Sequence, residues 1–202
     1  MASPVAEQKK GQDLQGTSHK SKHPPRSTKS ELPVTSESPV TSFLKHRIII
    51  FSRCQESYYQ WLRNKLKDKE FGNLVDEVCA VNITNIYSEF IKEIPKCTFA
   101  ILYHTTKFGR VNITNVTDAL YDKELQDLSH HLGKDKVIVV IDDMKVTSTK
   151  EKDRILKSQP SIGTLTKELF LFDENKNNLS KQVTCLKTIL GEKLIANTEA
   201  LL

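Results

Sequence analysis

The sequence predicts an α/β protein, a doubly wound, mostly parallel five-stranded sheet with helices on both faces, after a disordered N-terminal tail. Three observations predict this fold. Several short runs rich in Val and Ile are almost wholly apolar. They alternate with segments in which apolar residues recur every three or four positions. Glycine or proline stands at several of the boundaries. The alternation fills residues 46–191, which we expect to form one domain.

The apolar runs predict the strands and their order. A short run that is apolar at every position is typical of a strand buried on both faces. The second run is less apolar because Asp76 and Glu77 lie near its start, which favours an edge position. The fourth run, Val-Ile-Val-Val-Ile, is the most hydrophobic and is therefore central. These differences predict the strand order 2-1-3-4-5. The predicted strands cover residues 48–51, 75–81, 97–103, 137–141 and 169–172.

The helical periodicity predicts five helices, over residues 57–67, 85–94, 118–132, 150–156 and 179–190. Gly133 is placed to end the third helix in a positive-φ conformation, and Gly191 to end the last. A long polar loop is expected over residues 104–110, and a second loop around Pro160. Residues 192–202 either extend the last helix or fray.

The first 45 residues differ from the rest of the chain in composition. They are rich in Ser, Thr, Lys and Pro and carry a mild excess of basic residues. Such a segment buries too little apolar surface to offset the entropy of ordering it, so we expect a disordered basic tail over residues 1–45. The net charge of +5 is too dilute to require nucleic acid as a partner.

The cysteines and the apolar runs predict the cellular setting. None of the four cysteines has metal-ligand spacing, so we expect reduced thiols and no metal. No apolar run approaches the roughly 20 residues that a membrane span needs, and the N-terminus has no apolar signal segment. We therefore expect no membrane association and a cytoplasmic location, with the nucleus as an alternative.

Polar side chains follow the predicted strands, where ligands of open parallel sheets gather. The groups at this edge include hydroxyls, basic side chains and a pair of aspartates. Asp142 follows a buried strand, as does the Mg²⁺-holding aspartate of nucleoside triphosphatases, but the glycine-rich phosphate loop is absent. A turn-capping role for Asp142 is the simpler interpretation, and no cofactor is implied. The candidate binding residues are Ser52, Arg53, His104, Thr105, Arg110, Asp142 and Asp143.

Cys54 and His104 are the candidates for a catalytic nucleophile and its base. They follow the first and third strands, which are neighbours in the predicted order. Arg53 would help to hold a thiolate at Cys54. The alternative interpretation is a buried thiol and a surface imidazole. Residues 52–57 lack the Gly-x-Gly-x-x-Gly pattern that a dinucleotide-binding oxidoreductase places after its first strand.

The order of these features resembles Toll/interleukin-1 receptor (TIR) domains and flavodoxin-like signalling domains. The resemblance covers residues 47–143: the strand Ile-Ile-Ile-Phe ending at Ser52, the helix with Tyr-Tyr-Gln-Trp-Leu, and the strand Val-Ile-Val-Val-Ile before Asp142. TIR enzymes that cleave NAD use a glutamate, and the matching position is Glu124. Residues 117–120 replace the Ser-Trp-Cys surroundings of that glutamate. Glu124 is alternatively a solvated helix residue.

Three functional hypotheses follow. The leading one is an intracellular, non-enzymatic protein–protein interaction or regulatory module that binds a protein partner or a second copy of itself. The alternative is a TIR-like enzyme that processes NAD or another small nucleotide through Glu124 or through the pair Cys54 and His104. Nucleic-acid binding through the tail and the basic loops is the third, and the sequence offers no aromatic stacking platform to support it.

Overall fold

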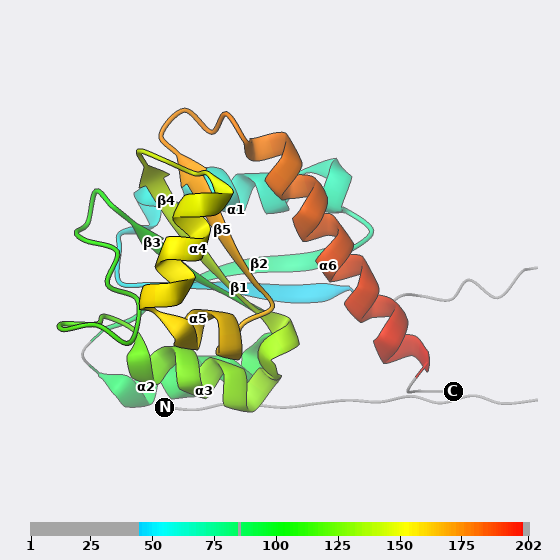
Figure 1. The fold of residues 1–202 in the computed structure, drawn as a ribbon. Coiled ribbons are helices and arrows are strands. Elements are labelled where there is room, and N and C mark those ends of the chain that lie inside the picture. The colour runs from blue at the N-terminus through cyan, green and yellow to red at the C-terminus, as the bar shows by residue number, and fades with distance from the viewer. Residues whose placement is uncertain (1–44, 85, 200–202) are drawn as a thin grey trace, which may run out of the picture. The chain divides into compact units, whose positions relative to one another are not determined.

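A computed structural model describes residues 45–84 and 86–199, with side chains through Glu192. The predicted tail lies outside the described residues, apart from Lys45. Five parallel strands form one sheet in the order β2-β1-β3-β4-β5, which confirms the predicted order (Figure 1). The strands are β1 (His46–Ser52), β2 (Val75–Asn82), β3 (Phe99–Thr105), β4 (Val137–Met144) and β5 (Glu168–Asp173).

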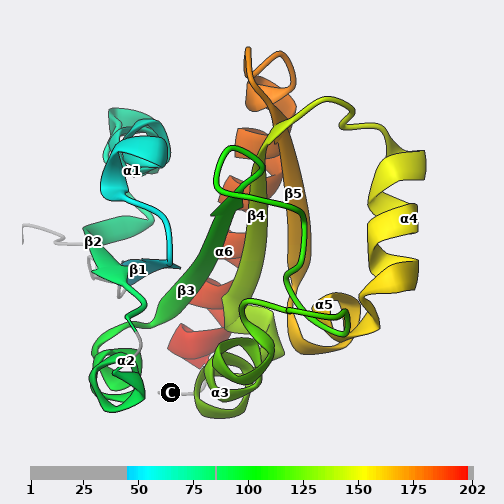
Figure 2. The same ribbon diagram turned by 90° about the vertical axis from the view of Figure 1, so that its left-hand side faces the viewer.

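The helices cover both faces of the sheet, as predicted for a doubly wound fold. Helices α1 and α6 lie on one face, and α2, α3, α4 and α5 lie on the other (Figure 2). The α-helices are α1 (Gln60–Leu66), α2 (Tyr87–Glu93), α3 (Asp122–Leu132), α4 (Thr149–Ser158), α5 (Pro160–Leu165) and α6 (Leu179–Glu199). Short 3-10 turns are η1 (Glu56–Tyr58), η2 (Lys69–Phe71), η3 (Ile94–Lys96) and η4 (Lys134–Lys136).

The core consists of two apolar layers, one on each face of the sheet. Successive residues of a strand point to opposite faces, so Ile48 and Ile50 pack towards α1 and α6, whereas Ile49 and Phe51 pack towards α2 and α3. All seven residues of β3 are buried. The edge strand β2 is mostly half-buried or exposed, as its two acidic residues predicted. The proportion of polar residues in each predicted strand therefore correctly indicated whether the strand is central or at the edge of the sheet.

The structure corrects where β3 and β4 end. His104 and Thr105 were expected to begin a loop, but they are the last residues of β3 and both are fully buried. Asp142 and Asp143 were expected after the fourth strand, but both belong to β4. Polar residues are tolerated inside a strand where other groups of the fold satisfy their hydrogen bonds, and the side chains of Thr105, Asp142 and Asp143 meet this condition.

Three helix boundaries also differ from the prediction. A short helix, α5, replaces the loop expected around Pro160, because proline fits the first helical position well. Asp118 has a left-handed φ of 60°, so α3 starts at Asp122 instead. Helix α6 runs past Gly191, so residues up to Glu199 extend the helix. Gly133 does end α3, with a φ of 82°, as predicted. Among the described residues, no helix has the length and apolarity of a membrane span.

Candidate functional site

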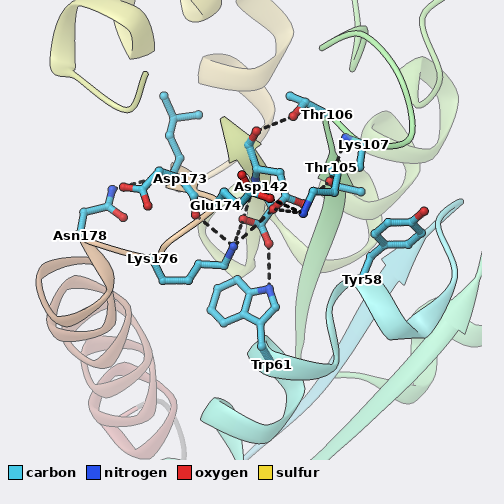
Figure 3. A network of polar contacts seen from close by, with 12 residues as sticks. Tyr58, Trp61, Thr105, Thr106, Lys107, Asp142, Asp173, Glu174, Lys176 and Asn178 are labelled. Carbon is cyan, nitrogen blue, oxygen red and sulfur yellow. Dashed lines mark hydrogen bonds and ion pairs between the residues drawn. The ribbon is translucent and has the colours of Figure 1, made fainter. Parts of the chain in front are cut away.

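Two polar clusters lie where the strands end. The first, the Asp142 cluster, consists of Trp61, Tyr103, Asp142 and Lys176, on the sheet face covered by α1 and α6. Figure 3 shows Trp61 and Lys176 pointing towards Asp142. The carboxylate of Asp142 is 1% exposed. Its Oδ2 accepts hydrogen bonds from the indole N–H of Trp61 and the hydroxyl of Tyr103, both at 2.7 Å. Burial raises the pKa of Tyr103, and the Asp142 charge adds to the effect, so the phenol stays a donor.

The other oxygen of Asp142 holds the loop between β5 and α6. Asp142 Oδ1 accepts from Lys176 Nζ at 2.6 Å and from the backbone N–H of Asp143 at 2.7 Å. Lys176 Nζ also donates to the carbonyl oxygen of Asp173 at 3.0 Å and lies 5.0 Å from the centre of the Trp61 ring. Both carboxylate oxygens therefore have two donors each. Such saturation compensates the desolvation of a buried charge.

Asp143 joins the loops after β3 and β4 to each other. Its Oδ2 accepts from the Thr105 hydroxyl at 2.6 Å, and its Oδ1 lies 3.3 Å from Lys107 Nζ. The Thr106 hydroxyl donates to the Asp143 carbonyl at 2.6 Å. Burial opposes ionisation of Asp143, but the hydroxyl of Thr105 and the two nearby lysines outweigh it, so its pKa is lowered. A left-handed φ of 57° at Asp143 marks the bulge that turns its side chain into this network.

The second cluster, the Arg53 cluster, consists of Arg53, Leu120, Tyr121 and Glu124. The Arg53 guanidinium donates to the Leu120 carbonyl at 2.9 Å and to Glu124 Oε1 at 2.5 Å. Its backbone N–H donates to the Tyr121 hydroxyl at 3.3 Å. Glu124 is 7% exposed, so the interpretation of Glu124 as a solvated helix residue is wrong. The ion pair fastens the start of α3 to the loop after β1.

Cys54 and His104 are both fully buried. Burial raises the pKa of the Cys54 thiol and lowers that of the His104 imidazole, so both groups favour their neutral forms. His104 Nε2 donates to the Arg110 carbonyl at 2.9 Å, and Nδ1 has no hydrogen-bond partner among the residues that the structure describes. Among the described contacts, no hydrogen bond joins the thiol to the imidazole. The interpretation of His104 as a surface imidazole is therefore wrong.

Gln159 holds the long segment between β3 and α3 in place, and no sequence pattern pointed to this residue. Gln159 is 3% exposed and lies between α4 and α5. Its side-chain oxygen accepts from the backbone N–H groups of Ile113 and Thr114, at 2.8 and 3.0 Å. Its side-chain nitrogen donates to the Val111 carbonyl at 2.7 Å. The segment is thus a fixed part of the fold.

The structure divides the predicted binding residues between these clusters. Thr105, Asp142 and Asp143 come together on the side of α1 and α6. Arg53 pairs with α3, and the Ser52 hydroxyl is buried and accepts from the Cys54 N–H at 3.0 Å. The side chain of Arg110 is exposed, while its carbonyl binds His104. The predicted binding residues therefore do not form one continuous polar surface.

The basic and aromatic residues of the Asp142 cluster, Trp61, Tyr103 and Lys176, were not predicted as site residues from the sequence. Trp61 was assigned to the apolar stripe of its helix, and Tyr103 to a buried strand. Both assignments are correct, but the polar atoms of these side chains reach Asp142. Lys176 lies in a turn with no regular pattern, and a left-handed φ of 56° directs it to the carboxylate. A lone tryptophan and a buried tyrosine each need a polar partner, which was the available signal.

Over the described part of the chain, no group of three or more His, Cys, Asp or Glu side chains is arranged to hold a metal ion. Comparisons with protein-family models, with curated proteins and with solved structures found no match to this chain.

Proposed function

We propose that the chain is an intracellular, non-enzymatic module that binds a protein partner through the loops after β3 and β4. The observation that carries the proposal is that the fold itself uses the groups that catalysis would need. Glu124 is paired with Arg53, and Asp142 already accepts four hydrogen bonds. The Cys54 thiol is buried with a raised pKa, whereas a nucleophilic cysteine needs an exposed site and a lowered pKa.

The loops after β3 and β4 supply the proposed binding surface. Phe108 is 48% exposed and Val146 is 54% exposed, and among the described residues Ile86 is the other large apolar side chain that is exposed. The two loops are neighbours, because Thr106 donates to the backbone carbonyl oxygens of Asp142 and Asp143, at 3.0 and 2.6 Å. An aromatic and an aliphatic side chain on joined loops suit the apolar centre of a protein interface.

The charges around these two side chains favour an acidic partner. Arg110 and Lys145 are exposed, and neither side chain makes an ion pair within the described residues. Lys107, in contrast, is occupied by Asp143 and Glu174, at 3.3 and 3.1 Å. A partner with an apolar side chain flanked by carboxylates would complement this surface. The four free thiols of the chain are in keeping with a reducing compartment.

The test is quantitative affinity capture from cell extract with the full chain as bait. We expect a set of proteins that the wild type and Ile86→Ser retain and that the double variant Phe108→Ser/Val146→Ser loses. Ile86 is a matched control because it is 56% exposed but follows β2. The same proteins on all three baits would contradict the proposed surface. Turnover of NAD or a nucleoside triphosphate by the purified chain, abolished in Glu124→Gln, would overturn the non-enzymatic function.

A further inference from the structure

The outer edge of β2 is open for pairing. Within residues 45–84 and 86–199, strand β2 is hydrogen-bonded only to β1, so one side of its backbone faces away from this sheet. Ile83 N–H donates to the Ser52 carbonyl of β1 at 2.8 Å. Because successive residues of a strand alternate sides, Cys79 and Val81 also bond to β1, and Val78 and Ala80 direct their backbone groups outward. Arg63 Nε reaches the Val78 carbonyl at 3.4 Å, which agrees with this orientation, and this long contact has to give way when a strand is added.

Space is present on both faces of this edge. A hollow of about 340 Å³ lies on the α1 side, with Leu66, Lys67 and Val78 in its lining. A second hollow, of about 500 Å³, lies beside α2, with Val81, Asn82 and Phe90 in its lining. An added strand would point alternate side chains to the two faces of the sheet, and each face has room for them.

The sequence of β2 fits a second copy of itself. Edge strands are usually protected by charged residues, but the charges of β2 are confined to its start, at Asp76 and Glu77. The following residues, Val78 to Val81, carry no charge and are only partly covered except for Val78. An antiparallel copy would move the acidic ends of the two strands apart, whereas a parallel copy would place them together.

The backbone orientation restricts the register of such a pair. In an antiparallel ladder, outward-facing residues must lie opposite outward-facing residues. A two-fold axis at Cys79 meets this condition within the regular part of β2, because it places Val78 opposite Ala80 of the second copy. Each Val–Ala pair exchanges two backbone hydrogen bonds, and a large side chain faces a small one. The two Asp76 carboxylates are then six residues apart along the strand, roughly 20 Å, which is beyond the screening length at physiological salt.

We propose that the chain forms a homodimer in which the β2 strands of two copies pair antiparallel around Cys79, giving a continuous ten-stranded sheet. The dimer surface is separate from Phe108 and Val146, so the inference does not depend on the proposed partner-binding loops. Cys79 and its counterpart form a non-hydrogen-bonded pair with Cα atoms about 4.5 Å apart, within the range that a disulfide can bridge.

The first test is the molar mass of the full chain in solution, measured by light scattering as the concentration is raised. We expect the mass to rise from 23.0 kDa towards twice that value. Cys79→Lys places two like charges against each other at the axis and should keep the chain monomeric. Cys185→Lys is the matched control, because Cys185 is exposed on α6, and it should still dimerise.

The second test is cross-linking with copper(II) phenanthroline, in which two copper(II) ions each take up one electron as two thiols release their protons and form a disulfide. Wild type and Cys185→Ser should give a cross-linked dimer, and Cys79→Ser should not. This readout does not depend on the folding of the lysine variant. A mass that stays at 23.0 kDa up to the solubility limit, or a dimer that survives Cys79→Lys, would overturn the proposal. Phe108→Ser/Val146→Ser should dimerise normally, which keeps the two proposals distinguishable.

Discussion

Replacing Asp142 by Asn tests whether the Asp142 cluster holds the fold together. The carboxylate accepts four hydrogen bonds, two on each oxygen, and is 1% exposed. Asparagine has the same shape but only one acceptor oxygen, so two of the four donors lose their acceptor. Lys176, whose side chain is 19% exposed, also loses its main counter-charge. We therefore expect a large loss of stability without any change in side-chain volume.

The magnitude follows from the buried ion pair. Removing one partner of such a pair costs about 3–5 kcal/mol, because the remaining charge is left uncompensated. With a urea m-value of about 2 kcal/mol/M, the midpoint of unfolding should fall by about 1.5–2.5 M. The assay is equilibrium urea unfolding followed by far-ultraviolet circular dichroism, since the Trp61 fluorescence itself depends on the indole contact with Asp142.

Two further variants make the result decisive. Asp153→Asn changes an exposed aspartate on α4 and should alter the free energy of unfolding by no more than about 0.5 kcal/mol. In Asp142→Asn/Lys176→Met the unpaired lysine charge is also removed. The free energy of unfolding of the double variant should therefore fall by less than the sum of the decreases in Asp142→Asn and Lys176→Met. A loss below about 1 kcal/mol in Asp142→Asn, or strict additivity, would refute the role assigned to the ion pair.

Two more predictions concern buried titratable groups. Burial lowers the pKa of His46 and His104 below 6.5, so the unfolded chain binds more protons at mildly acid pH. The urea midpoint should therefore fall as the pH drops through about 6.5, and His46→Gln/His104→Gln should reduce that dependence; a flat profile in the wild type would contradict the assignment. In a thiol-labelling time course at neutral pH, exposed Cys185 should react first, and buried Cys54 and Cys97 only as the chain unfolds. Labelling of all four thiols in one fast phase would disprove this order.

The strand order of the sheet could be predicted from the sequence because the composition of each strand depends on how deeply that strand is buried. The central strands have no outer face, so β3 and the body of β4 had to be apolar throughout, and β2 could keep its acidic residues only at an edge. The ends of elements were harder to predict. His104 and Asp142 resemble loop residues in sequence, and two of the partners that make them acceptable inside strands are the Arg110 carbonyl and Lys176. Those partners lie in irregular segments that periodicity does not describe.

The sequence indicated where polar side chains gather in the fold, but it did not indicate which partners these side chains have. The rule that strand ends gather polar groups selected Arg53, Thr105 and Asp142, and in the structure each of them lies at or near the end of a strand. It did not tell whether these groups face solvent or each other, because that depends on side chains from α1, α3 and the β5–α6 loop. Glu124 shows the difficulty, since its position in the helix does not reveal that Arg53 approaches from the loop after β1.

The buried polar clusters bear on the proposed binding surface. Loops that carry binding residues lose affinity if they must be ordered when the partner arrives. Here the loop with Phe108 begins at Thr105 and Thr106, both bonded to Asp143, and the loop with Val146 begins just after Asp143 itself. The ionic network therefore fixes the base of both loops before any partner binds. An aspartate pair at the end of a buried strand, which in an enzyme could hold a metal ion, serves in this proposal to hold an apolar surface in position for a partner.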